Sequence, residues 1–134
     1  MNTVSANKPP IQVALVEDDP EIRANLAHRV GRSPGFRLLR SYSDAESALA
    51  DLPRHPPDVV LMDINLPGID GVEASRRLRI DHPAVAVILL SSYDEAEFAD
   101  LTGDCGAAAY VPKSMFGPDR LEVLWRAISR SRSG

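Results

Sequence analysis

The sequence predicts a doubly wound α/β fold, in which a five-stranded parallel sheet is covered by helices on both faces. Two observations lead to this fold class. Short apolar runs alternate with longer amphipathic stretches five times along the chain, as repeated strand–helix units require. Four of these five runs end directly in polar or charged residues, which is typical of strands whose carboxyl ends line a ligand site.

Length and composition fit a single domain. The chain has 134 residues, of which 44% are hydrophobic and 25% charged. We expect a flexible leader at residues 1–10, the folded domain at residues 11–131 and a tail or linker stub at residues 132–134. The only cysteine, Cys105, excludes an internal disulfide and fits a reducing cytoplasm. There is no signal-peptide pattern, and the longest apolar run, at residues 85–90, is too short to span a membrane.

The first strand–helix unit begins with a mostly apolar run at residues 11–16, which predicts a buried strand. Asp19 then matches a helix N-cap, with Pro20 at the first helical position. Apolar residues recur at four-residue spacing along the helix that follows, and so form one buried face: Ile22, Leu26 and Val30.

The second unit starts with a more polar strand at residues 36–42, which suggests a place near the edge of the sheet. Ser43, with Glu46 three residues later, matches a capping box. The pattern therefore predicts a short helix that begins at Ser43 and ends near Leu52, where Pro53 stops it.

The three remaining units repeat this alternation. Strands are predicted at residues 59–62, 85–90 and 108–111. Helices are predicted at residues 72–80 and 94–101. A last helix follows the fifth strand, and its apolar residues share one face: Leu121, Leu124, Trp125 and Ile128.

Chemically active side chains follow four of the five predicted strands. The first strand is followed by an acidic pair, the third by one acid, the fourth by a hydroxyl and the fifth by an ammonium group: Glu17 and Asp18, Asp63, Ser91, and Lys113. Because the carboxyl ends of parallel strands lie at the same edge of a sheet, we expect these side chains to converge.

Three converging carboxylates disfavour one another's ionisation, and a cation relieves this conflict. Mg²⁺ is a hard cation that takes oxygen ligands, often with several waters. The candidate ligands are the carboxylates of Glu17, Asp18 and Asp63, together with a backbone carbonyl from the loop after Asp63, for which Asn65 is the best placed. The sequence therefore predicts a magnesium site at this edge.

A carboxylate held beside Mg²⁺ can attack phosphorus and form an aspartyl phosphate. Phosphoryl transfer depends mainly on positioning and on neutralising charge at the phosphoryl oxygens. Lys113 would supply a positive charge to one of these oxygens, and the Ser91 hydroxyl would donate to another. Asp63 is the candidate nucleophile.

These motifs resemble the receiver domain of response regulators in two-component systems, over roughly residues 11–130. The acidic pair stands in Leu-Val-Glu-Asp-Asp, and residues 59–71, Val-Val-Leu-Met-Asp-Ile-Asn-Leu-Pro-Gly-Ile-Asp-Gly, are close to the family's phosphorylation signature. The resemblance implies a flavodoxin-like fold with strand order 2-1-3-4-5. It also implies Mg²⁺ as the cofactor, with Mn²⁺ able to substitute.

The resemblance implies a role for each residue of the set. Asp63 would be the phospho-acceptor and Lys113 the phosphate-binding lysine. The metal ligands would be Glu17, Asp18, Asp63 and the Asn65 carbonyl, with Asp18 as a direct ligand. Ser91 would be the switch hydroxyl and Tyr110 the aromatic switch residue.

One position departs from the family pattern. Many members have a proline after the lysine, joined by a cis peptide bond, whereas Ser114 follows Lys113 here and Pro112 precedes it. A cis Lys113–Ser114 bond would be costly, so the loop is either trans or strained. The Lys-Ser version resembles receivers attached to helix-turn-helix outputs.

The resemblance implies a cytoplasmic phosphorelay protein that is not a turnover enzyme, with Mg²⁺-dependent self-phosphorylation and slow self-dephosphorylation. Its partner would be a histidine kinase or a phosphotransfer protein, with a homodimer left open and no membrane association. The net charge of −4 argues against bulk nucleic-acid binding by the domain itself, so DNA would be reached only through an effector domain outside this chain. Transcription control is the expected output.

Other functions stay open from the sequence alone. A stand-alone receiver would act through protein–protein contacts alone, and a pseudo-receiver would do so without phosphorylation. An aspartyl-nucleophile hydrolase or phosphotransferase is a further class, but Asp63-Ile64-Asn65 lacks the second acid that such a mechanism uses, and the chain has no glycine-rich nucleotide loop.

Overall fold

The computed structural model describes residues 9–92 and 105–133. Within them the elements alternate between strand and helix almost throughout, in this order: β1 (Ile11–Val16), α1 (Pro20–Gly31), β2 (Phe36–Tyr42), α2 (Ala45–Asp51), the 3-10 turn η2 (Leu52–Arg54), β3 (Val59–Asp63), α3 (Gly71–Asp81), β4 (Ala86–Ser91), β5 (Ala109–Pro112), the 3-10 turn η3 (Lys113–Met115) and α5 (Pro118–Ser133). The predicted helix at residues 94–101 lies outside the described residues.

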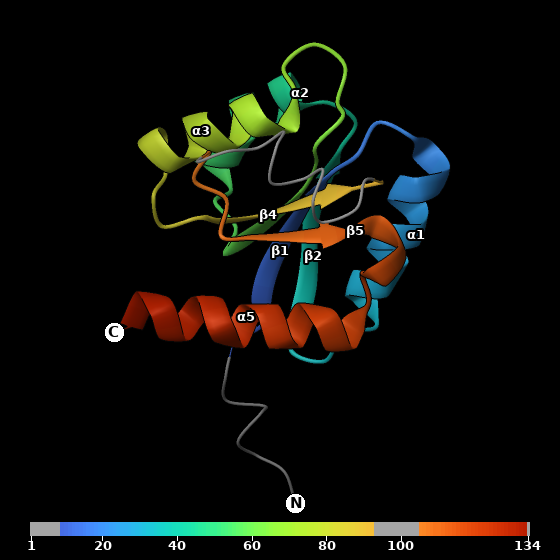
Figure 1. The fold of residues 1–134 in the computed structure, drawn as a ribbon, viewed down its shortest axis with the longest axis vertical. Helices are drawn as coiled ribbons and strands as arrows, with labels where there is room; N and C mark the ends of the chain where they lie inside the picture. Colours follow the sequence, from blue (N-terminus) through green and yellow to red (C-terminus); the bar gives the residue numbers. More distant parts are fainter. Residues whose placement is uncertain (1–8, 93–104, 134) are drawn as a thin grey trace, which may run out of the picture.

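The five strands form one sheet in the order β2-β1-β3-β4-β5, and all four neighbouring pairs are parallel. This confirms the predicted fold class and strand order. In Figure 1, α1 and α5 cover one face of the sheet, while α2 and α3 cover the other. β2 lies on one side of β1, whereas β3, β4 and β5 follow one another on the other side. The strand order therefore reverses between β1 and β3. This reversal is where open α/β sheets bind ligands.

The core consists of two apolar layers, one on each face of the sheet. Side chains alternate between these layers along β1: Val13 and Leu15 face the layer under α1 and α5, and Ala14 and Val16 face the layer under α2 and α3. Residues of β3 and β4 alternate in the same way and are entirely buried. Burial on both faces explains why these strands appear in the sequence as continuous apolar runs.

Helix starts agree with the sequence in one case and correct it in another. Asp19 caps α1 as predicted, accepting hydrogen bonds from the main-chain N–H groups of the first turn. The predicted capping box of Ser43 and Glu46 is wrong, because Asp44 is the N-cap of α2 and accepts from Ser47 N at 2.6 Å. Asp44 is extended there, with φ −151°, which aims its carboxylate at the free N–H groups of the helix.

Two strands, β4 and β5, are shifted by one residue relative to the prediction, and β3 runs one residue further, to Asp63. β4 begins at Ala86, because the N–H of Val85 bonds to His82 O in the turn after α3. β5 begins at Ala109 and ends at Pro112, which opposes Ser91 of β4. β5 has a neighbour on one side only within the described residues, and an edge position tolerates a residue without an N–H group. In the part of the chain that the structure describes, no helix combines the length and apolarity needed to cross a membrane.

Candidate functional site

The carboxyl ends of four strands bring the predicted site residues to one edge of the sheet. Glu17 and Asp18 directly follow β1, and Asp63 is the last residue of β3. The sheet register continues this arrangement, since Asp63 opposes Leu90 and the next residue of β4 is Ser91. Lys113 directly follows β5. The convergence expected from a parallel sheet is therefore present.

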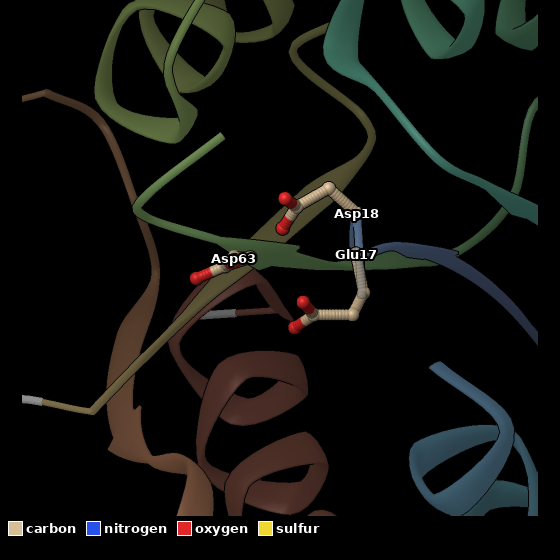
Figure 2. Close-up of side chains that lie close together, drawn as sticks. All are labelled: Glu17, Asp18 and Asp63. Atoms are coloured by element: carbon tan, nitrogen blue, oxygen red, sulfur yellow. The ribbon is translucent and has the colours of Figure 1, made fainter. Parts of the chain in front are cut away.

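Three carboxylates meet at this edge. One oxygen from each of Glu17, Asp18 and Asp63 lies within 4.8 Å of the others. Figure 2 shows Glu17 and Asp18 extending from the end of β1 toward Asp63 on β3. Glu17 and Asp63 are almost completely buried, with 1% and 2% of their surface exposed, while Asp18 is exposed. The cluster thus has a buried floor and one acid that is open to solvent.

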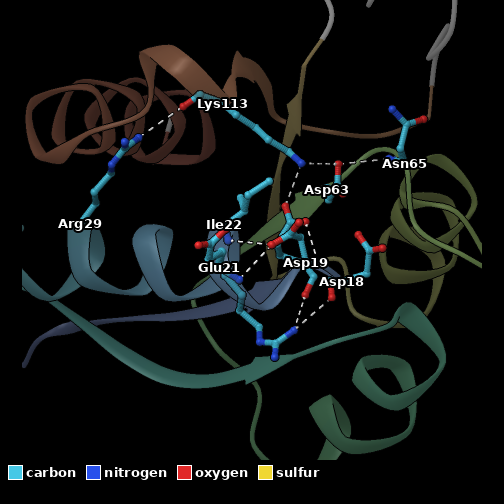
Figure 3. Close-up of polar contacts among 10 residues, drawn as sticks. Asp18, Asp19, Glu21, Ile22, Arg29, Asp63, Asn65 and Lys113 are labelled. Carbon is cyan, nitrogen blue, oxygen red and sulfur yellow. Dashed lines mark hydrogen bonds and ion pairs between the residues drawn. The ribbon is translucent and has the colours of Figure 1, made fainter.

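The Lys113 ammonium reaches into this cluster and joins two of its acids. Nζ lies 2.9 Å from Glu17 Oε1 and 3.3 Å from Asp63 Oδ1. Asp63 Oδ1 also accepts a hydrogen bond from the main-chain N–H of Asn65 at 3.2 Å, as Figure 3 shows. The other oxygen of the buried glutamate, Oε2, accepts from Asp19 N at 3.2 Å. Each buried acid is therefore held by a charge and by a main-chain donor.

Burial and the neighbouring charges shift the protonation of this group. Burial raises the pKa of Asp63 to about 6, against the opposing effects of the Asn65 N–H and the Lys113 ammonium, and the Glu17 charge raises it further. For Lys113, burial alone would lower the pKa, but the adjacent carboxylates of Glu17 and Asp63 outweigh burial and raise it. The site therefore holds its lysine charged and resists ionisation of Asp63.

The donor set fits a small divalent cation. Three carboxylates face one ammonium group, so full ionisation leaves an excess of negative charge. All the converging ligand atoms are oxygens, which Mg²⁺ prefers. Mg²⁺ binds oxygen at about 2.1 Å, so oxygens around one ion lie roughly 3 to 4 Å apart, and one oxygen from each of the three acids lies within 4.8 Å of the others. Apart from its ion pair with Lys113, Glu17 Oε1 is a buried acceptor that makes no hydrogen bond to the described residues. Glu17, Asp18 and Asp63 are the residues that would hold the ion.

Helix α1 contributes two arginines that the sequence pattern did not single out. Arg23 Nη1 donates to the main-chain oxygen of Glu17 at 2.8 Å and approaches that of Asp18 at 3.5 Å. Arg29 Nη1 donates to the main-chain oxygen of Phe116 at 2.9 Å, just beyond Lys113. The sequence places both arginines on one predicted helix, but it could not predict their acceptors, which are main-chain oxygens whose positions depend on how the loops fold.

The segment after Asp63 packs tightly against the start of α3. Asp70 caps α3 by accepting from Glu73 N at 2.8 Å. Gly71, the first residue of the helix, approaches the end of β3 so closely that a β-carbon would overlap the main-chain oxygen of Asp63. Glu46 of α2 accepts from Ile69 N at 3.0 Å and so braces the same loop, rather than closing a capping box. These contacts restrain the main chain from Asp63 to the start of α3.

The remaining predicted residues occupy distinct places. Ser91 is fully buried at the end of β4 and lines a hollow of about 370 Å³ together with Lys113. Tyr110 lies on β5 opposite Leu89, with 37% of its surface exposed. None of the described peptide bonds is cis, so Lys113 and Ser114 are joined by a trans bond. The main-chain N–H of Asn65 contacts Asp63, while its side chain is exposed.

Comparison with known proteins agrees with this geometry. The sequence model of the response regulator receiver domain matches residues 13–125. The chain belongs to this family. Receiver domains are the signal-receiving part of two-component systems, so the acids, the hydroxyl and the lysine described above stand at the edge of a receiver domain.

Related regulators and solved structures extend the comparison. The chain is 33% identical to the transcriptional regulatory protein DegU of Brevibacillus brevis over 90% of its own length and 50% of that protein. It is 36% identical to the positive alginate biosynthesis regulatory protein of Pseudomonas aeruginosa, over 91% of this chain and 49% of that one. The receiver thus spans about half the length of these curated relatives.

The solved structures show the same fold. A two-component response regulator of the LuxR family from Aurantimonas sp. SI85-9A1 is 28% identical with a TM-score of 0.80, covering 90% of this chain and 86% of that one. The signal receiver domain of NarL from Mycobacterium tuberculosis superimposes with a TM-score of 0.81 at 23% identity, over 91% of this chain and 98% of that domain. The second similarity supports the fold alone.

Proposed function

We propose that this receiver accepts a phosphoryl group on Asp63 from a phosphorylated histidine of a partner kinase or phosphotransfer protein. The single observation that carries the proposal is the grouping of Asp63 with Glu17, Asp18 and Lys113 at one sheet edge. A buried carboxylate beside two further acids and an ammonium group is a costly arrangement for a purely structural site. Phosphoryl transfer is a chemistry that uses all of these groups.

In the proposed reaction a carboxylate oxygen of Asp63 attacks phosphorus. A P–O bond forms, the P–N bond of the phosphohistidine breaks, and the imidazole leaves with the electron pair of that bond and takes up a proton. Lys113 holds its positive charge through the step and moves from Asp63 Oδ1 to a phosphoryl oxygen. Ser91, at the end of the adjacent strand, donates its hydroxyl to another phosphoryl oxygen.

Glu17, Asp18 and Asp63, with the Asn65 carbonyl, would hold Mg²⁺ or Mn²⁺. When bound, the ion neutralises negative charge on the acids and on the transferred group. Asp18 is the exposed member of the set and gives access from solvent. Glu17 is buried and fixed through both oxygens, which makes it suited to orienting its neighbours.

The response proposed for the phosphorylated state is a change in the surface around β5, through Ser91 and Tyr110. Tyr110 and Met115 expose apolar surface there, which a partner could cover in one state and not in the other. The relatives named as transcriptional regulators are about twice the length of this chain. We therefore propose a cytoplasmic receiver whose output is transcription control, exerted through an effector domain outside this chain.

The test is direct phosphorylation. The protein is incubated with phosphoramidate or acetyl phosphate and Mg²⁺, and its intact mass is measured. We expect one phosphoryl group to be added, to be lost on treatment with hydroxylamine as an acyl phosphate should be, and to be absent without the metal. Asp63→Asn removes the nucleophile and should accept none.

Asp81→Asn is the matched control, because Asp81 is an exposed acid at the far end of α3 and should leave phosphorylation unchanged. If the wild-type protein takes up no phosphoryl group with either donor, the proposal is wrong and a phosphorylation-independent receiver is favoured. If Asp63→Asn still accepts one, a different residue is the acceptor.

A further inference from the structure

The Lys113 loop, residues 113–116, is attached to α1 by the half-buried Arg29. Arg29 Nη1 donates to the main-chain oxygen of Phe116 at 2.9 Å and reaches that of Lys113 at 3.4 Å. Figure 3 shows the guanidinium extending from α1 to the main chain at Lys113, on the side away from the acids. The contacts join positions 84 and 87 residues apart, so they anchor the loop to a distant core element.

The buried side chain of Phe116 anchors the far end of this loop, but hydrogen bonds within the loop restrain Lys113 only weakly. η3 is a three-residue turn without a side-chain cap, and the main-chain bond that closes it, from Phe116 N to Lys113 O, is 3.3 Å long. Ser114 is exposed, and its φ angle is not limited by a ring as that of a proline would be. A turn of this kind does not define the position of its first residue by itself.

Lys113 nevertheless requires a defined position. Its ammonium is shared between Glu17 Oε1 at 2.9 Å and Asp63 Oδ1 at 3.3 Å, and both acids are buried and fixed. The attraction between charges falls with distance, and a misplacement of about 1 Å in a reacting group can reduce a rate by up to about 100-fold. Because Lys113 is the first residue of the turn, any movement of the main chain there would displace its ammonium group.

We propose that Arg29 is a positioning residue for the phosphorylation of Asp63. By holding the main-chain oxygens of Phe116 and Lys113, it determines where the Lys113 ammonium meets the incoming phosphoryl group. Arg29 itself touches neither Asp63 nor the acidic pair in any contact among the described residues. This inference rests on the proposed function of Asp63, and it assigns to α1 a part in setting the reaction rate.

The test compares three variants of the whole chain, two at Arg29 and one control. Arg29→Met keeps the apolar stem of the side chain but removes its donors, and Arg29→Lys retains one cationic donor. Phosphorylation by phosphoramidate is followed by intact mass over a range of donor concentrations, and Mg²⁺ binding is measured by calorimetry. We expect Arg29→Met to lower the maximal rate about tenfold, with the half-saturating donor concentration and the Mg²⁺ affinity within about twofold of wild type, and Arg29→Lys to recover part of the loss.

Ser33→Ala is the matched structural control. The Ser33 hydroxyl donates to Arg29 O at 2.8 Å, so its loss weakens the same end of α1 without touching the Lys113 loop. We expect this variant to phosphorylate at the wild-type rate. Amide exchange supplies a second readout, in which Phe116 N–H should exchange faster in Arg29→Met and remain unchanged in Ser33→Ala.

The outcomes separate this inference from the proposed function. If Asp63 is phosphorylated in the wild type and Arg29→Met reacts at the same rate, the positioning role is refuted while the acceptor role stands. Equal slowing in Ser33→Ala would also refute it, because helix stability would then explain the effect. If the wild-type protein accepts no phosphoryl group, both proposals fail.

Discussion

Replacing Asp63 by asparagine should stabilise the metal-free protein at neutral pH, although it removes the proposed acceptor. Asparagine has nearly the same shape and keeps an oxygen that can accept from Asn65 N. What it removes is a buried negative charge beside Glu17. Lys113 keeps its closer ion pair, at 2.9 Å from Glu17 Oε1.

The magnitude follows from the raised pKa of Asp63, which is about 6 in the folded protein. An unfolded aspartate has a pKa of about 3.9, and each unit of difference corresponds to about 1.4 kcal/mol. The folded state therefore binds more protons between about pH 4 and pH 6, and the free energy of unfolding falls as the pH rises through this window. Above it the full cost of about 3 kcal/mol is present, so Asp63→Asn should gain about 2 to 3 kcal/mol at pH 7.5 and about 0.5 kcal/mol at pH 4.

Urea unfolding with a chelator, measured at several pH values, tests this expectation. The difference between Asp63→Asn and wild type should grow between pH 4 and pH 6 and then level off. Glu122→Gln is the control, because it removes one negative charge from an exposed side chain of α5 and should change the free energy of unfolding by less than about 1 kcal/mol. A variant that is less stable than wild type at pH 7.5, or a difference that does not change with pH, would refute the electrostatic reasoning.

Three further predictions concern the supports of the site and the edge of the sheet. Gly71→Ala should lower the free energy of unfolding by about 1 to 3 kcal/mol in urea, since its β-carbon meets main-chain atoms at the end of β3, whereas Gly31→Ala, with open space around it, should not. Arg23→Met should weaken Mg²⁺ binding about tenfold in calorimetry, because Arg23 holds the main chain of the acidic pair; unchanged affinity would argue against this. Burial raises the pKa of Tyr42 to about 12, together with the hydrogen bond to Asp51 and the charge of Asp51. One phenol should therefore titrate near pH 12 in alkaline absorbance spectra, and its pKa should move back toward the ordinary value of about 10 in Asp51→Asn. The stability that the phenol proton contributes is present below about pH 10 and is lost as the pH rises toward 12.

The fold and the placement of the acids followed from the sequence for one physical reason. Parallel strands buried on both faces give unbroken apolar runs, and whatever follows each run must lie at the same edge. Glu17, Asp63 and Lys113 could therefore be grouped from sequence positions alone, and the structure brings them within ion-pair distance. Their protonation could not be predicted in this way, because it depends on how completely Asp63 is buried.

The start of α2 shows where local patterns become ambiguous. Ser43 and Asp44 are adjacent, and each has a side chain suited to an N-cap. The sequence favoured Ser43 because Glu46 stands three residues later, but in the structure Asp44 is the extended residue before the helix, and its carboxylate accepts from Ser47 N. Glu46 is then free to accept from Ile69 N, a contact between distant positions that no local motif encodes. The same limit applies to Arg29, whose acceptors lie at the other end of the chain.

The excess negative charge at this edge links stability to metal binding. Burial raises the pKa of Asp63, and the nearby Glu17 charge adds to this effect. A divalent cation beside Asp63 would offset both contributions, so the cost of ionised Asp63 in the metal-free fold and the affinity for the ion are linked. It follows that Asp63→Asn should gain stability without metal and lose Mg²⁺ affinity, and that saturating Mg²⁺ should narrow the stability difference between the two proteins. Parallel urea unfolding with chelator and with Mg²⁺ measures both effects. A variant that gained stability but bound Mg²⁺ as tightly as wild type would show that Asp63 is not part of the ion's site, and the acidic pair alone would have to hold it.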